Sequence, residues 1–259
     1  MIIDGHMHIG FAHKRYPLRI KTVERLVEIM DQYNVGMGVV SSLKASQYDF
    51  EEGNEELARE IERFPGRFIP FCTVNPRYLK EAEAEVERYI IGKSWKGVKL
   101  HPVNHTYAAD CLAAQRITKL AGELGAVVAI HSTADDLSHP RRIASLARAC
   151  PDTRIILVHM GALWAWWDAI EAAVANPNIY INTADAMFCD GQVEYAVQQL
   201  GAERIMWGSN LPTSYLAPNL VRITCADISD EAKDMILGGS IARLLGLSPG
   251  AQCGKVEVM

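Results

Sequence analysis

The chain has 259 residues, of which 49% are hydrophobic and 22% are charged, and its formal net charge is -5 at pH 7. This length and composition predict a single globular domain spanning residues 1–259. The mildly acidic charge balance excludes the basic surface of a nucleic-acid binder, so we expect no nucleic-acid partner.

The expected location is the cytoplasm. Six cysteines are scattered along the chain and none forms a C-x-x-C pair, which is typical of a reducing compartment. The N-terminus lacks the pattern of a signal segment. No apolar run approaches the ~18 residues of a membrane span. We therefore expect a soluble protein that does not bind membranes.

Eight short runs rich in Val and Ile recur along the chain. Most are apolar at nearly every position, a pattern typical of parallel strands that helices cover. The predicted strands are Ile2–His6, Val35–Ser41, Arg67–Thr73, Gly97–His101, Ala126–His131, Arg154–His159, Asn178–Thr183 and Arg204–Gly208.

A helix-length segment follows each predicted strand. These segments are Lys21–Tyr33, Glu51–Phe64, Arg77–Ile91, Asp110–Leu124, Pro140–Ala149, Trp164–Ala175, Gln192–Leu200 and Asp230–Leu237, with a short extra C-terminal helix at Ser240–Leu245. Successive strands start 24 to 33 residues apart, which is the size of one βα unit. Eight such units predict an α/β fold, a closed (β/α)8 barrel of the TIM type. An open doubly wound sheet is the alternative, but no glycine-rich phosphate turn follows the first strand.

Two histidines follow the opening apolar residues in the pattern His-Met-His. Residues i and i+2 of a strand point to the same side, so His6 and His8 can direct two imidazoles to one face. Neutral imidazoles are ligands that zinc prefers, and a site needs one or two more. Taken alone, the pair is equally compatible with polar residues where a strand meets a loop.

Five of the eight histidines fall at predicted strand ends. They are His6, His8, His101, His131 and His159. In a (β/α)8 barrel the carboxyl ends of all strands share one rim, where active sites are built. The sequence therefore predicts that these imidazoles meet.

Several segments together resemble the amidohydrolase superfamily, in the amidohydrolase-related branch that includes aminocarboxymuconate-semialdehyde decarboxylase. They are Ile3-Asp-Gly-His-Met-His8, Gly97-Val-Lys-Leu-His-Pro102, His131, His159, Arg204-Ile-Met-Trp-Gly-Ser-Asn-Leu-Pro212 and Leu237-Gly-Gly-Ser-Ile-Ala-Arg-Leu-Leu-Gly246. The resemblance covers nearly the whole chain.

The resemblance implies one bound divalent metal ion, zinc in most members, with His6, His8 and His131 as ligands. It implies a site role for His159, as a second-metal ligand or, in the decarboxylase-like branch, as a catalytic residue. The family's strand-eight Asp contacts the metal and accepts the proton of its bound water. Here Asn210 stands at that position, as a metal ligand and candidate catalytic residue.

Asn210 is the most informative departure from the family pattern. An amide has nearly the shape of a carboxylate, and its oxygen can still contact a metal, but it carries no charge and is not a proton acceptor under ordinary conditions. Another group could take the proton, the reaction could need no strong base, or the site could be degenerate. The alternative is that Asn210 is an ordinary turn residue before Pro212 with no role in a site.

Four polar residues on or near the predicted rim are further candidates. Lys99 shares the parity of His101 and could form an ion pair, bind a substrate carboxylate or be carboxylated between two metals. His101 is a candidate substrate-binding residue. Asp4 lies deeper in the barrel and could orient a ligand, and Asp185 is a candidate replacement base.

Three functions are considered for a small-molecule substrate, and the family resemblance favours the first of them over the other two. The first is a metal-dependent hydrolase acting on a C–N or C–O bond, of the amide or lactone type. The second is a metal-dependent decarboxylase of an unsaturated or aromatic carboxylic acid, in which His159 moves the proton. The third is a non-catalytic barrel. The tryptophan cluster between Trp164 and Trp167 additionally predicts a homo-oligomer.

Overall fold

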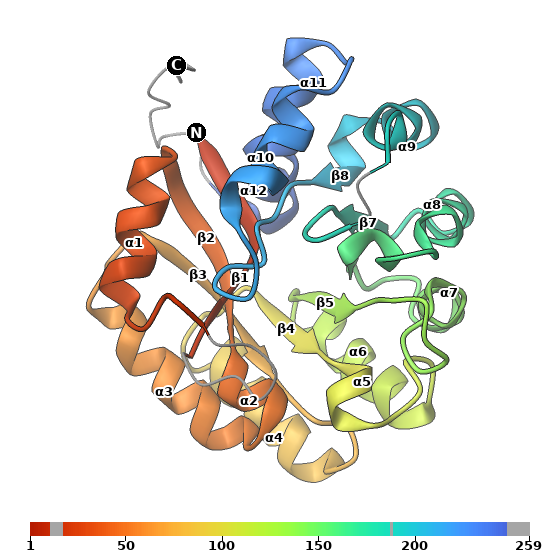
Figure 1. Cartoon of the computed structure of the whole chain (residues 1–259). Coiled ribbons are helices and arrows are strands. Elements are labelled where there is room, and N and C mark those ends of the chain that lie inside the picture. The colour runs from red at the N-terminus through yellow and green to blue at the C-terminus, as the bar shows by residue number, and fades with distance from the viewer. Residues whose placement is uncertain (11–17, 187–188, 248–259) are drawn as a thin grey trace.

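The computed structural model describes residues 1–10, 18–186 and 189–247, and it confirms the predicted (β/α)8 barrel (Figure 1). Eight parallel strands lie side by side in chain order from β1 to β8. They are β1 Ile2–Ile9, β2 Val35–Ser42, β3 Phe68–Thr73, β4 Gly97–Leu100, β5 Val127–His131, β6 Ile155–Val158, β7 Ile179–Asn182 and β8 Ile205–Met206. The open doubly wound alternative is thereby excluded.

Backbone hydrogen bonds join β1 to the segment that follows β8. The Gly5 N–H donates to the Trp207 carbonyl at 2.9 Å, and the Asn210 N–H donates to the His6 carbonyl at 2.9 Å. A Cβ atom at Gly5 would lie only 2.7 Å from the Trp207 carbonyl oxygen, so glycine permits this close approach. These contacts bring the two ends of the sheet together although the regular part of β8 is only two residues long.

Helices cover the outside of the strands (Figure 1). The main ones are α1 Val23–Gln32, α3 Phe50–Glu62, α4 Leu79–Ile90, α6 Leu112–Glu123, α7 Pro140–Ala149, α8 Trp166–Ala175, α9 Gln192–Leu200 and α10 Leu216–Thr224. At the C-terminal end, α11 Asp230–Asp234 continues through the π-helical turn Met235–Gly239 into α12 Ser240–Leu245. The predicted extra C-terminal helix corresponds to α12, whereas α10 was not predicted.

Alternate strand residues divide the core into two clusters. One face of each strand packs under the helices, as Val128 and Ile130 of β5 do. The other face fills the barrel interior, where Val127 and Ala129 belong to a separate cluster that also includes Ile241 of α12. Because both faces are buried, the strands are apolar throughout, as the sequence pattern indicated. In the described part of the chain, no helix is long and apolar enough to cross a membrane.

Three local differences from the predicted elements bear on the site. Strand β1 continues to Ile9, so His8 lies within the strand. Two short helices that were not predicted, α2 Leu43–Gln47 and α5 Pro102–His105, follow β2 and β4. Each begins with a local signal, because Ser42 caps α2 through its side chain and Pro102 occupies the first turn of α5, where proline is favoured.

Candidate active site

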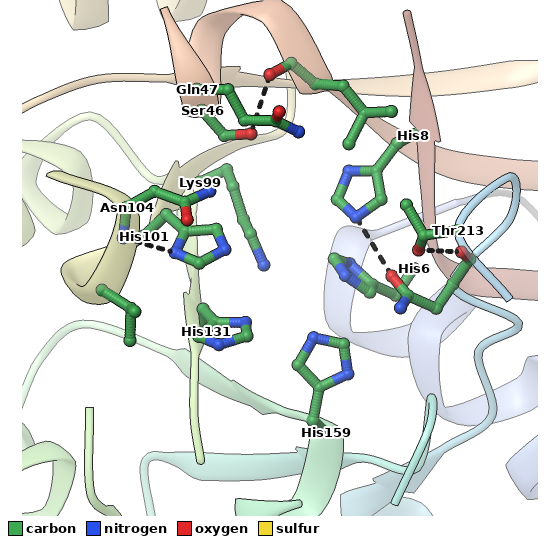
Figure 2. Close-up of a pocket in the computed structure, with 13 residues that line it drawn as sticks. His6, His8, Ser46, Gln47, Lys99, His101, Asn104, His131, His159 and Thr213 are labelled. Carbon is green, nitrogen blue, oxygen red and sulfur yellow. Dashed lines mark hydrogen bonds between the residues drawn. The ribbon is translucent and has the colours of Figure 1, made fainter. Parts of the chain in front are cut away.

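A cavity of about 360 Å³ opens at the carboxyl ends of the strands (Figure 2). All five predicted strand-end histidines line it. The lining residues are His6, His8, Leu43, Ser46, Gln47, Lys99, His101, Val103, Asn104, His131, His159, Asn210 and Thr213. The convergence expected from the barrel rim is therefore present.

His6 and His8 project from the same face of β1, with ring centroids 4.6 Å apart. His6 is buried, and its Nε2 atom has no hydrogen-bond partner among the described residues. Burial first, and the charge of Lys99 second, hold the His6 pKa well below its usual value. The neutral ring therefore offers a buried lone pair or N–H to the cavity that nothing in the described structure satisfies.

Hydrogen bonds on both ring nitrogens orient His8. Its Nδ1 lies 3.0 Å from the Ser41 hydroxyl oxygen, and its Nε2 lies 3.1 Å from Oδ1 of Asn210. An amide oxygen only accepts, so Nε2 carries the proton in this arrangement and the Ser41 hydroxyl donates to Nδ1 in the neutral ring. The hydroxyl can also accept, which allows the opposite tautomer when Nε2 is needed as a ligand.

His101 and His131 form the other side of the cavity. Their rings stack with centroids 4.0 Å apart, and His131 lies 4.9 Å from the ring of His159. Nδ1 of His101 accepts from the Asn104 N–H at 3.3 Å. Burial is the main cause that lowers the pKa of both histidines well below the usual value. Both rings are therefore neutral near pH 7.

Lys99 reaches into the cavity from β4 and is only 2% exposed. Its Nζ atom has no hydrogen-bond partner among the described residues. Burial lowers its pKa to about 7. Of the three interpretations made from the sequence, a structural ion pair finds no support in the described part of the chain, because no carboxylate contacts Nζ. A desolvated ammonium among neutral imidazoles is a strong attractor for an anion.

His159 lies directly after β6 and donates from Nδ1 to the Ala184 carbonyl at 2.7 Å. This bond leaves Nε2 as the ring nitrogen available to the cavity that His159 lines. Burial first, and the charge of Lys99 second, lower its pKa to about 4, whereas Asp185 opposes that shift. In the free protein His159 is therefore a proton acceptor at neutral pH rather than a donor.

Three polar residues at consecutive strand ends adopt the left-handed backbone conformation. The φ angles are 68° at His159, 50° at Asp185 and 58° at Asn210. Non-glycine residues adopt this conformation at a cost and keep it where surrounding contacts enforce it, often at functional sites. Here it is found shortly after β6, β7 and β8, and the Asp185 and Asn210 side chains are hydrogen-bonded to each other.

Asp4 and Asp185 lie behind the residues that line the cavity. Oδ1 of Asp4 accepts from the backbone N–H groups of His6 and Ser209, each at 3.0 Å, so Asp4 positions the backbone, consistent with the orienting role expected for it. Asp185 accepts from Nδ2 of Asn210 at 2.6 Å. It therefore reaches the site through Asn210, and it does not line the cavity itself.

The donor set fits a divalent ion in one part of the cavity. His6 has an unpartnered buried nitrogen, and the 3.1 Å between His8 Nε2 and Asn210 Oδ1 is close to the roughly 3.0–3.4 Å separation of two ligands on one ion. The predicted third ligand, His131, instead stacks on His101. No three His, Cys, Asp or Glu side chains in the described ranges converge as a ready-made set. A metal here would start from two imidazoles and an amide oxygen, without a charged ligand in contact.

Residues of the two short helices complete the cavity, and the sequence reasoning did not identify them. Ser46 and Gln47 come from α2, and Val103 and Asn104 come from α5. Two residues in the sequence could have indicated these helices: Ser42, which caps α2, and Pro102, which begins α5. Trp164 and Trp167, in contrast, do not line the cavity, and they are 77% and 47% exposed.

A family model described as amidohydrolase matches residues 3–247. The chain therefore belongs to this amidohydrolase family, as the motif resemblance indicated. Membership of this family makes the chain an enzyme, a hydrolase or a carboxy-lyase. No curated protein sequence matches the chain.

Several solved structures share the fold over nearly their full length. The 2,6-dihydroxybenzoate decarboxylase from Rhizobium is 15% identical with a TM-score of 0.77, over 95% of this chain and 98% of that one. The 5-carboxyvanillate decarboxylase from Sphingomonas paucimobilis is 18% identical with a TM-score of 0.75, over 95% and 99%. A dihydroxybenzoic acid decarboxylase from a Polaromonas species, solved with manganese and 2-nitroresorcinol, is 16% identical with a TM-score of 0.76, over 95% and 97%. At these identities the likeness establishes the common fold.

Proposed function

We propose that this protein is a metal-dependent decarboxylase of an unsaturated or aromatic carboxylic acid. The observation that carries the proposal is Lys99, a buried lysine in the cavity whose Nζ has no partner among the described residues. A carboxylate substrate would provide the missing counter-charge, whereas a neutral amide or lactone would not. The decarboxylase activity of the structural relatives points in the same direction.

Asn210 also favours decarboxylation over hydrolysis. Hydrolysis requires a group that removes a proton from water, and the strand-eight amide is not such a group. Decarboxylation instead requires delivery of a proton to the carbon that loses the carboxylate. The amide at Asn210 is therefore less of an obstacle to a decarboxylase than to a hydrolase.

His159 is the proposed proton carrier. Its Nε2 faces the cavity, and the charge of Lys99 is one cause of its lowered pKa. A substrate carboxylate beside Lys99 would offset that charge and so raise the pKa of the imidazole. His159 then takes up a proton from solvent on Nε2 and transfers it to the substrate carbon, which returns the ring to its neutral form. The bond from that carbon to the carboxylate breaks, its electron pair returns to the substrate, and CO2 leaves.

One divalent ion is proposed at His6, His8 and Asn210, with His131 as the further ligand expected from the family. Such an ion would polarise a substrate oxygen and stabilise negative charge as it develops. Manganese in a structural relative and zinc in the family expectation are the two candidates. Lys99 and His101 are proposed to bind the substrate, with Lys99 contacting its carboxylate and His101 packing against it beside His131.

A metal-dependent hydrolase of amides or lactones, the function favoured from the sequence, becomes the second candidate. The observation in its favour is the Asp185 carboxylate, which lies 2.6 Å from Nδ2 of Asn210 and provides a proton acceptor close to the site.

We further propose that the chain forms one domain and assembles as a homo-oligomer through the face around the exposed Trp164 and Trp167.

A product assay separates the two activities. Purified protein supplied with Mn2+ or Zn2+ is incubated with aromatic carboxylic acids, beginning with 2,6-dihydroxybenzoate and 5-carboxyvanillate, and CO2 release is measured. A parallel series offers amides and lactones and measures the acid produced. CO2 release that Lys99→Met abolishes supports the decarboxylase, whereas hydrolysis that Lys99→Met leaves intact supports the second candidate.

A further inference from the structure

Asn210 presents its two amide atoms to two different partners. Its Nδ2 donates to Oδ2 of Asp185 at 2.6 Å, while its Oδ1 lies 3.1 Å from Nε2 of His8. If the amide were rotated by half a turn, its oxygen would face the Asp185 carboxylate, and two acceptors would be in contact. The carboxylate of Asp185 therefore selects the orientation in which the amide oxygen points towards His8.

Asp185 is itself held in place by two hydrogen bonds to Asn219. Its backbone N–H donates to Oδ1 of Asn219 at 2.9 Å, and its Oδ1 accepts from Nδ2 of Asn219 at 3.2 Å. Asn219 is buried in α10, and Arg222 one turn later donates to its Oδ1 at 3.3 Å. Helix α10 thus fixes the carboxylate that orients the amide.

A carboxylate hydrogen-bonded to the amide also changes the amide's electronic character. A charged acceptor at Nδ2 polarises the amide and increases the negative charge on its oxygen, an effect that is stronger in a site shielded from water. Asp185 thereby supplies, one hydrogen bond away, part of the negative charge that Asn210 lacks.

We propose that Asp185 is the positioning residue of this site: its carboxylate fixes the Asn210 amide so that the amide oxygen faces His8 and serves as a ligand. The two residues together take the place of the single strand-eight aspartate of the family. Only the part of this inference that concerns ion binding rests on the proposed function, because the amide has this orientation without an ion.

The test exchanges the two side chains. Asp185→Asn removes the charge, Asn210→Asp places two carboxylates against each other, and the double variant Asp185→Asn/Asn210→Asp restores a donor facing an acceptor with the charge moved to position 210. Asp135→Asn is the matched control. Its carboxylate accepts from Ser138 and Leu137 in the loop after β5, and it does not line the cavity.

The first measurement is the tautomer of His8 in metal-free protein, read from its 15N NMR shifts. We expect the proton on Nε2 in the wild type and in Asp135→Asn. In Asp185→Asn the amide of Asn210 can rotate, so we expect a substantial fraction with the proton on Nδ1 and Ser41 as its acceptor. A single Nε2–H tautomer in Asp185→Asn would overturn the proposed orienting role.

The second measurement is Mn2+ affinity by titration calorimetry. Removing a group that supports a metal ligand typically weakens binding 10- to 100-fold, and we expect Asp185→Asn to lie in that range. The double variant should bind at least as tightly as the wild type, because position 210 would then hold a carboxylate. A double variant no better than Asp185→Asn would contradict the proposal. If the wild type binds no divalent ion, the proposed metal site fails, and the His8 tautomer still decides the role of Asp185.

Discussion

Asp4 on the first strand accepts a hydrogen bond from the backbone N–H of Ser209, 205 residues later, at 3.0 Å. The same oxygen accepts from the N–H of His6. One buried carboxyl oxygen thus connects the strand that carries the histidine pair to the segment that carries Asn210. The closure of the barrel and the alignment of the site therefore depend on the same side chain.

Two substitutions of Asp4 should distinguish how much its hydrogen-bond acceptor and how much its charge contribute to the stability of the fold. Asp4→Ala leaves two buried N–H groups unsatisfied at ~1–3 kcal/mol each, so we expect the free energy of unfolding to fall by about 2–6 kcal/mol. Asp4→Asn retains an acceptor oxygen and should cost much less. Urea unfolding of the three proteins measures the difference. Equal losses in both variants would show that charge, and not hydrogen bonding, determines the contribution.

Lys99, the proposed substrate-binding residue, is expected to reduce the stability of the fold. Its pKa falls from 10.5 in the unfolded chain to about 7 in the folded protein, so between these values the unfolded chain binds the extra proton. The free energy of unfolding should therefore rise as pH increases from 7 towards 10, by an amount on the order of a few kcal/mol. Below pH 7 both states are protonated and this contribution is constant.

Lys99→Met should remove that dependence on pH. The variant should be more stable than the wild type at pH 6, with a smaller advantage at pH 9, and it should lose decarboxylation. Urea unfolding at pH 6, 7.5 and 9 measures this, with the exposed Lys96→Met as the control. A variant with the same slope against pH as the wild type would show that Lys99 does not titrate in this range.

His159→Gln should reduce turnover and leave the fold intact. A positioned acid–base group is typically worth ~10²–10⁴-fold, and glutamine can neither accept nor deliver a proton, so kcat should fall by that amount. His139→Gln is the control, because His139 is the N-cap residue of α7 and does not line the cavity. Rates of CO2 release for the three proteins provide the measurement. A His159→Gln enzyme within a few-fold of wild type would exclude His159 as the proton carrier.

Divalent ions should stabilise the protein through the strand-one histidines. An ion present at 100 times its dissociation constant contributes ~2.7 kcal/mol, so Mn2+ or Zn2+ should raise the melting temperature and a chelator should reverse the effect. The His6→Ala/His8→Ala double variant should show no such increase. If it responded as strongly as the wild type, the ion would bind elsewhere.

The exposed face around α8 should mediate self-association. Leu163 and Trp164 are 63% and 77% exposed, and the ring of Trp167 stacks on Tyr195 with centroids 4.6 Å apart. Burial of this surface in an oligomer would remove apolar area from water. Sedimentation should show a dimer or larger assembly that Trp164→Glu dissociates, and a monomeric wild type would contradict this prediction.

The sequence alone was sufficient for the barrel and for much of the cavity. Apolar runs at regular spacing are local patterns, and eight βα units leave few other topologies. His6, His8, His101, His131 and His159 could be placed at one rim because each lies at or near the carboxyl end of a predicted strand, and parallel strands end on the same side. The substitution at Asn210 was also visible, since it interrupts a motif.

Only the tertiary structure decided how these side chains meet. Two contacts join residues far apart in the chain: Asp185 bonds to Asn210, and His131 stacks on His101. The structure also shows that Lys99 Nζ has no hydrogen-bond partner among the described residues. Periodicity places a residue on a face, but it does not specify ring rotation, amide orientation or the left-handed backbone at His159, Asp185 and Asn210. Those depend on packing and hydrogen bonds that exist only after the strands have closed, which is why the partner of Asn210 could not be read from the sequence.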